Sequence, residues 1–108
     1  MVLKITNNAT TTTTARISNT DTSLTVASGT GTLFPVLGAG DFFQATLQDT
    51  NGNFEIVKVT ARTGDIMTIE RAQSGTLAIP FVANSRFEIR VTADNLQDYV
   101  DSIDFLLL

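Results

Sequence analysis

Residues 42–71 read FFQATLQ-DTNGN-FEIVKVTA-RTGD-IMTIER, and this stretch decides the fold class. Three runs rich in β-branched and aromatic residues are separated by two short runs of turn-forming residues. Asn51-Gly52 favours a type I′ hairpin turn, in which both central residues have positive φ angles. The stretch therefore predicts three antiparallel strands joined as a meander, over residues 42–48, 54–61 and 66–71.

Shorter strand patterns lie on both sides of this meander. Residues 23–27 and 86–91 alternate between apolar and polar side chains, as half-buried strands do. Residues 2–6 alternate briefly and are compatible with an edge strand. Residues 33–37 are apolar but contain Pro35, which cannot donate a ladder hydrogen bond, so this segment is expected to be a loop.

The C-terminal residues have helical periodicity. Leu96, Val100 and Ile103 are spaced at i, i+4 and i+7, which places them on one face of a helix. Thr92 is a suitable N-cap, so the sequence predicts a helix over residues 93–104. The helix has two interpretations: it caps the sheet of its own chain, or it docks on a partner. The chain then ends in an apolar tail made of Phe105, Leu106, Leu107 and Leu108.

The fold class expected from these patterns is mainly β, as a small antiparallel β-sandwich or partly open barrel with a short C-terminal helix. A single domain accounts for the 108 residues. We expect it to have three parts: an extended N-terminal arm or edge strand over residues 1–17, a β core over residues 18–92, and the helix with its apolar tail over residues 93–108.

The composition argues against several classes of function. The chain has no His, Cys or Trp, so it lacks the side chains that most often move protons, attack as thiolates or hold soft metals. Its net charge of −4 and scattered Lys and Arg give no electrostatic reason to bind nucleic acid. No apolar run is long enough to span a membrane. We expect a protein that is not an enzyme, carries no metal or cofactor, and contacts neither nucleic acid nor a membrane.

One acidic run is similar to a calcium-binding loop. It begins at Asp49, but Gly52 stands fourth instead of sixth, and Thr60 occupies the twelfth position, where a bidentate Glu belongs. A hairpin turn explains the run better. Further along, Arg71 and Gln73 carry groups that make several hydrogen bonds at once, which indicates a structural role in fixing loops.

Three glutamates are the remaining candidates for chemistry. Glu55, Glu70 and Glu88, together with the Asp residues, could supply paired carboxylates for glycoside hydrolysis. The competing interpretation places these carboxylates on a solvated strand face, where they pair with Arg side chains across strands. The second interpretation is favoured, because strand positions of this kind explain the charges without any catalytic role.

Two segments are candidates for binding a partner. Thr11, Thr12 and Thr13 belong to a stiff, extended tract that could pair with the sheet edge of a neighbouring subunit, and the alternative is a polar loop or exposed strand. The tail Phe105, Leu106, Leu107 and Leu108 places apolar surface at a chain end, where residues are usually polar.

Several longer motifs invite comparison with a known family. They are Leu33-Phe34-Pro35, Gly40-Asp41-Phe42-Phe43, NFEIVKVTARTGD at 53–65, TIERAQSGT at 68–76, Phe81, and EIRVT at 88–92. Over roughly residues 18–96 the chain resembles the short β-rich modules of tailed-bacteriophage virion proteins, which often begin tail-fibre-like proteins. Such proteins continue into a shaft and a receptor-binding tip, whereas this sequence ends at Leu108.

The resemblance implies a non-enzymatic virion structural protein that is synthesised in the cytoplasm of a host bacterium. It would form a homo-oligomer, with a trimer as one candidate, and bind other capsid, neck or tail proteins. Capsid cementing or decoration and fibre-base attachment are the expected roles. A receptor-binding or carbohydrate-binding tail module is one alternative, and a carboxylate-based glycan hydrolase is another.

Overall fold

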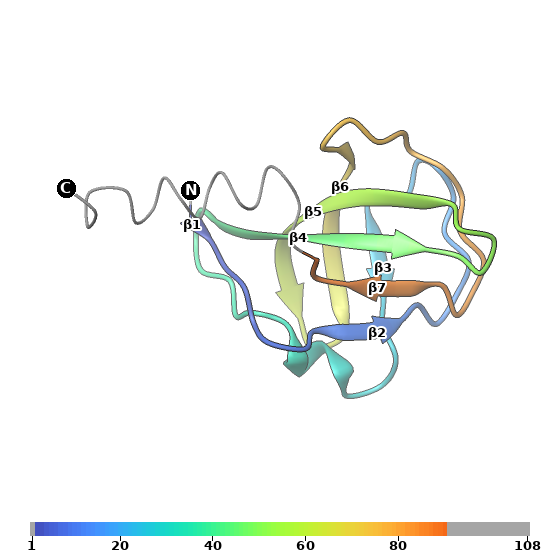
Figure 1. The fold of residues 1–108 in the computed structure, drawn as a ribbon. Helices are drawn as coiled ribbons and strands as arrows, with labels where there is room; N and C mark the ends of the chain where they lie inside the picture. The colour runs from blue at the N-terminus through green and yellow to red at the C-terminus, as the bar shows by residue number, and fades with distance from the viewer. Residues whose placement is uncertain (1, 91–108) are drawn as a thin grey trace.

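The computed structural model describes residues 2–90, which form a mainly β body (Figure 1). In chain order the elements are β1 (Val2–Leu3), β2 (Thr10–Thr12), β3 (Ser23–Thr25), the 3-10 helix η1 (Thr30–Leu33), β4 (Asp41–Gln48), β5 (Phe54–Thr63), β6 (Ile66–Gln73) and β7 (Arg86–Glu88). No α-helix lies within residues 2–90. The helix predicted over residues 93–104 and the apolar tail lie outside the described residues.

The strands form one curled sheet in the order β2-β7-β4-β5-β6-β3, and every neighbouring pair along this path is antiparallel. The meander predicted from the sequence is confirmed, because β4, β5 and β6 are consecutive neighbours. β1 lies off this path and pairs in parallel with the start of β4. Two register shifts between β5 and β6 accompany the curl into a half-barrel, as bulges increase strand twist.

Hydrogen bonds also connect the two ends of the sheet. Thr13 forms a bridge with Val26, just beyond β2 and β3. The amide of Thr14 donates to the carbonyl of Thr25 at 3.0 Å, and the amide of Ala27 donates to the carbonyl of Thr12 at 3.0 Å. The two strands at the ends of the sheet therefore satisfy part of each other's free edge, which an open sheet would leave exposed.

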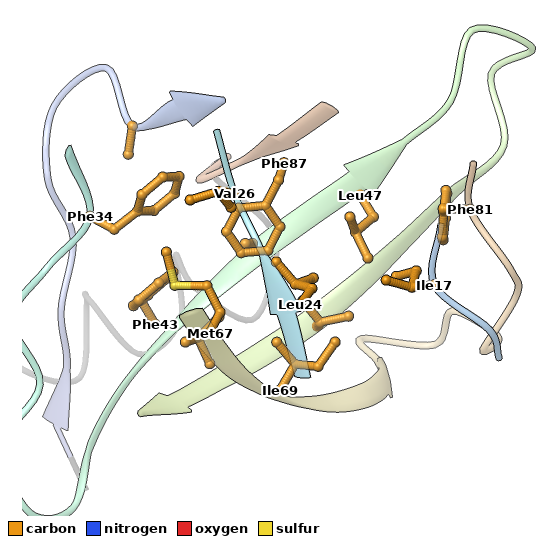
Figure 2. Close-up of a cluster of buried hydrophobic side chains, with 14 residues drawn as sticks. Ile17, Leu24, Val26, Phe34, Phe43, Leu47, Met67, Ile69, Phe81 and Phe87 are labelled. Carbon is orange, nitrogen blue, oxygen red and sulfur yellow. The ribbon is translucent and has the colours of Figure 1, made fainter. Parts of the chain in front are cut away.

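The core fills the inside of this curl. Figure 2 shows apolar side chains from opposite parts of the sheet pointing toward one another. Phe34, from the loop after η1, stacks on Phe43 with ring centroids 5.6 Å apart and lies 5.2 Å from Phe87. The predicted apolar loop thus contributes a core residue. The fully buried set also includes Val26, Leu47, Val57, Val59 and Met67.

The β4–β5 turn differs from the predicted type I′ turn. Gly52 has a φ of +87°, but Asn51 is not among the residues with positive φ. The amide of Gly52 donates to the carbonyl of Asp49, and the Asp49 carboxylate accepts from the amides of Asn51 and Asn53. The prediction was wrong because the Asp49 side chain stabilises a longer loop, in which only the glycine needs the left-handed conformation.

A second turn makes a close backbone contact with η1. Gly31 lies against Gly64, such that a Cβ on Gly31 would lie 2.0 Å from the Gly64 carbonyl oxygen. The Asp65 carboxylate accepts hydrogen bonds from the amides of Gly29 and Gly31 at 3.0 and 2.8 Å. These backbone donors hold the pKa of Asp65 below its ordinary value. The segment that carries Phe34 into the core is thereby fixed to the β5–β6 turn.

Candidate functional site

The body contains a buried ion pair between the neighbouring strands β5 and β6. Arg71 donates from Nε and Nη2 to the two carboxylate oxygens of Glu55, each at 2.8 Å. The Glu55 side chain is 0% exposed and that of Arg71 is 8% exposed. This bidentate arrangement is the strong form of an Arg–carboxylate contact, and it is shielded from solvent.

The Glu55 carboxylate also accepts two backbone hydrogen bonds. They come from the amides of Ala72 and Ile79, at 2.9 and 3.0 Å. Burial alone raises the pKa of this carboxyl, but the hydrogen bonds from Arg71 and from these amides outweigh it, so the pKa lies below its ordinary value. Glu55 is therefore held ionised in the folded protein.

Arg71 satisfies its remaining donors with backbone carbonyls of two loops. Its Nη1 donates to the carbonyls of Ser18 and Asp21, and its Nη2 donates to the carbonyl of Ile79 at 2.7 Å. The predicted loop-fixing role of Arg71 is confirmed. We refer to Glu55, Arg71 and the loop residues bonded to them as the Glu55–Arg71 clamp, because it joins residues 18–21 and 72–79 to the centre of the sheet.

The three glutamates of the sequence analysis have different surroundings. Glu70 is exposed and lies opposite Lys58 in the β5–β6 register. Glu88 contacts Arg86 and Arg90, residues of its own segment two positions away, at 3.4 and 3.0 Å. The expectation of a solvated face is wrong for Glu55, because the largely buried guanidinium of Arg71 offsets the desolvation of its carboxylate.

These positions limit the acidic chemistry available to the body. A glycosidase acid needs a carboxyl whose pKa is raised, whereas the pKa of Glu55 is lowered and both its oxygens are bonded. Within residues 2–90, no three His, Cys, Asp or Glu side chains are placed to hold a metal ion. The Asp49 carboxylate accepts from the turn residues Asn51 and Asn53.

The threonine tract pairs with its own chain. Thr11 lies opposite Phe87 in the β2–β7 ladder, and both the amide and the carbonyl of Thr13 bond to residues 84–85. The side chains of Thr11 and Thr13 are buried, whereas Thr12 is exposed. The argument that this tract offers free ladder groups does not hold for Thr11 and Thr13. A contact of Thr12 with a partner stays a prediction.

An open polar hollow of about 330 Å³ lies beside the β4–β5 turn. It is lined by Thr12, Gln48, Asp49, Thr50, Asn84 and Arg86. Small-molecule sites are usually concave and largely apolar, with a few convergent polar groups. This hollow has no aromatic side chain in its lining, so it offers hydrogen bonds without a stacking surface.

A second surface feature is apolar. Residues 2–6 run beside residues 33–42, as the blue and teal segments at the left of Figure 1 show. The amide of Val2 donates to the Gly40 carbonyl at 3.1 Å, and the Thr6 hydroxyl donates to the Leu33 carbonyl at 2.6 Å. We call this pair of segments the apolar ribbon, because it exposes the side chains of Val2, Ile5, Leu33 and Val36.

Neither the clamp nor the ribbon was predicted from the sequence. A signal existed for the burial of Glu55, since it shares a strand face with Val57 and Val59, but nothing in the sequence identified Arg71 as its partner. The predicted tail residues Phe105, Leu106, Leu107 and Leu108 lie outside the described residues. Within residues 2–90, no helix has the length and apolar character needed to cross a membrane.

Comparison with known protein families and with curated protein sequences found no match. The resemblance to phage virion modules therefore rests on the motifs quoted above. What it implies for this chain is a proposal.

Proposed function

We propose that the protein is a non-enzymatic structural component of a tailed bacteriophage particle, which oligomerises and binds other particle proteins. Capsid cementing or decoration and attachment at the neck or fibre base are the roles that suit such a body. The site of synthesis would be the cytoplasm of a host bacterium, and the destination would be the virion.

The observation that carries this proposal is a β body whose loops are fixed to the sheet and whose surface exposes apolar side chains. The Glu55–Arg71 clamp holds two loops to the sheet through a buried ion pair and partly buried hydrogen bonds. At the same time, Val36 and Ile5 of the apolar ribbon are 79% and 53% exposed. A preorganised surface loses little conformational entropy on binding, which favours permanent assembly contacts.

The carboxylate-based hydrolase is the weaker alternative. The body's fully buried carboxylate, Glu55, has a lowered pKa and a bidentate partner, which is unsuited to donating a proton to a leaving group. Glu70 and Glu88 are strand carboxylates, exposed or half-exposed, and Glu88 pairs with Arg.

The receptor-binding alternative has one feature in its favour, the polar hollow beside the β4–β5 turn. Glycan binding there would rest on hydrogen bonds from Asn84, Arg86 and their neighbours. Binding of host-cell surface glycans to the purified chain, abolished by Asn84→Ala, would favour this alternative over a purely structural role.

Localisation in the particle tests the main proposal. An antibody against this chain would be applied to purified particles of the source phage, and labelled particles would be imaged by electron microscopy. We expect label at one fixed location, in a copy number that is a multiple of the symmetry there. Absence of the chain from purified particles, measured by mass spectrometry, would refute a virion role.

A further inference from the structure

We propose that the apolar ribbon is the docking surface for the C-terminal segment, residues 101–108, of a second copy of this chain. This deepens the proposed function, on which it rests, by naming the surface through which the protein oligomerises. The surface belongs to the described body, and the segment that fits it is recognised by its sequence: two aspartates followed by four apolar residues.

The apolar side of the contact is already formed in the single chain. Backbone and hydroxyl hydrogen bonds at both ends hold residues 2–6 against residues 33–42. The side chains of Val2, Ile5, Leu33 and Val36 remain 43–79% exposed. The occupant is placed on a second copy because the proposed function requires the chain to self-associate.

The charges of the two parts are complementary. All seven Lys and Arg lie within residues 2–90, with seven of the eleven Asp and Glu, so this part is neutral and the net charge of −4 belongs to residues 91–108. Lys4 is exposed on the ribbon, and Arg62 donates to the Pro35 carbonyl beside Val36. Of these two cations, Lys4 suits Asp101 or Asp104, because Arg62 already interacts with the Asp65 carboxylate of its own chain.

The path of the chain permits a reciprocal contact. β7, the last described strand, lies beside β4 on the path of the sheet, and β1 pairs with the beginning of the same β4 strand. The C-terminal segment therefore follows a strand that shares a neighbour with the ribbon. In a closed symmetric oligomer each copy would offer one ribbon and one tail, so the same contact recurs at every interface.

The test uses the full chain and measures mass in solution by sedimentation equilibrium over a wide concentration range. Val36→Asp and Leu107→Asp should each raise the dissociation constant of self-association at least tenfold, because each places a carboxylate in an apolar contact. Leu77→Asp is the matched control. Leu77 is as exposed as Val36 but lies on the loop between β6 and β7, so its substitution should leave the dissociation constant unchanged.

A charge exchange tests the pairing itself. Lys4→Glu and Asp104→Lys should each weaken self-association, and the double variant should recover most of the loss if the two groups meet across the interface. Far-ultraviolet circular dichroism would verify that every variant keeps its strand content.

Three results would overturn the inference. The wild-type chain could remain a monomer at all concentrations while Leu107→Asp lowers its melting temperature, which would assign the tail to its own body. Val36→Asp and Leu107→Asp could leave self-association unchanged, or Leu77→Asp could weaken it equally. Each result leaves the virion role standing if the wild-type chain is still found in particles, so the two proposals fail separately.

Discussion

Replacing Arg71 with Met would test whether the Glu55–Arg71 clamp sustains the fold. The substitution preserves much of the side-chain volume and removes every donor. Glu55 would then be a fully buried carboxylate without its bidentate partner, and the carbonyls of Ser18, Asp21 and Ile79 would lose their shared donor. The loops that carry these carbonyls should loosen first.

The expected magnitude follows from the burial of the pair. Removing one partner of a buried ion pair costs about 3–5 kcal/mol, since an uncompensated charge stays inside. Ser18, Asp21 and Ile79 are at least partly exposed, so water can replace Arg71 at their carbonyls and adds little to this cost. A loss of about 4 kcal/mol is a large part of the roughly 5–15 kcal/mol that stabilises a small domain.

Urea unfolding followed by circular dichroism measures this loss, because the chain has no Trp to report by fluorescence. Arg86→Met is the matched control: the Arg86 side chain is 62% exposed and 3.4 Å from Glu88, so we expect a change within about 0.5 kcal/mol. If Arg71→Met does not fold, Arg71→Lys gives a smaller loss on the same scale, about 2 kcal/mol. A loss below about 1 kcal/mol for Arg71→Met would refute the reasoning.

Three further predictions concern pH and glycine. The pKa of Glu55 is lowered on folding, so its stabilisation is complete above the ordinary carboxyl pKa and is lost as pH falls through the folded value. The difference in unfolding free energy between wild type and Glu55→Gln should therefore shrink from pH 7 to pH 3. Gly31→Ala should destabilise the fold by about 1–3 kcal/mol, because the added Cβ clashes with the Gly64 carbonyl. Gly38→Ala should cost less, because the added Cβ meets only the Asp41 carboxylate, which can move. Thermal melts of the two variants would measure the difference. Gly52→Val should cost about 1–3 kcal/mol in urea unfolding because φ is +87°, although open space surrounds the site; a change within about 0.5 kcal/mol would contradict this.

The strands were predictable from sequence because their signal is local. Alternation and turn residues placed β4, β5 and β6 within one residue of their observed bounds, except that β5 and β6 each extend two residues further at their C-terminal ends. The turn type was not predictable from Asn51-Gly52 alone, since the side chain of Asp49 competes for the same backbone amides. Local propensity gave way there to a specific hydrogen-bond pattern.

The clamp was harder to predict from the sequence because it depends on contacts between distant residues. The spacing of Glu55 and Arg71 along the chain carries no pattern, and their pairing exists only once β5 and β6 are in register. The threonine tract shows the same limit. Its β-branched composition predicted extended chain correctly, but only the β2–β7 ladder places Thr11 and Thr13 inward.

The ladder between β2 and β7 also constrains the order in which the strands can pair during folding. Thr10 pairs with Glu88, 78 positions later, so the second strand of the body cannot pair until the last described strand is available. Contacts this distant in sequence slow folding, because the chain loses the entropy of loop closure before the hydrogen bonds of the ladder form. Until β2 arrives, β7 and β3 each present an unpaired edge to other chains. The interval between synthesis and closure is therefore when this protein is most exposed to misassembly. High expression raises the rate of encounter with other chains during this interval, and low temperature or a substitution that weakens the bridge between Thr13 and Val26 lengthens it.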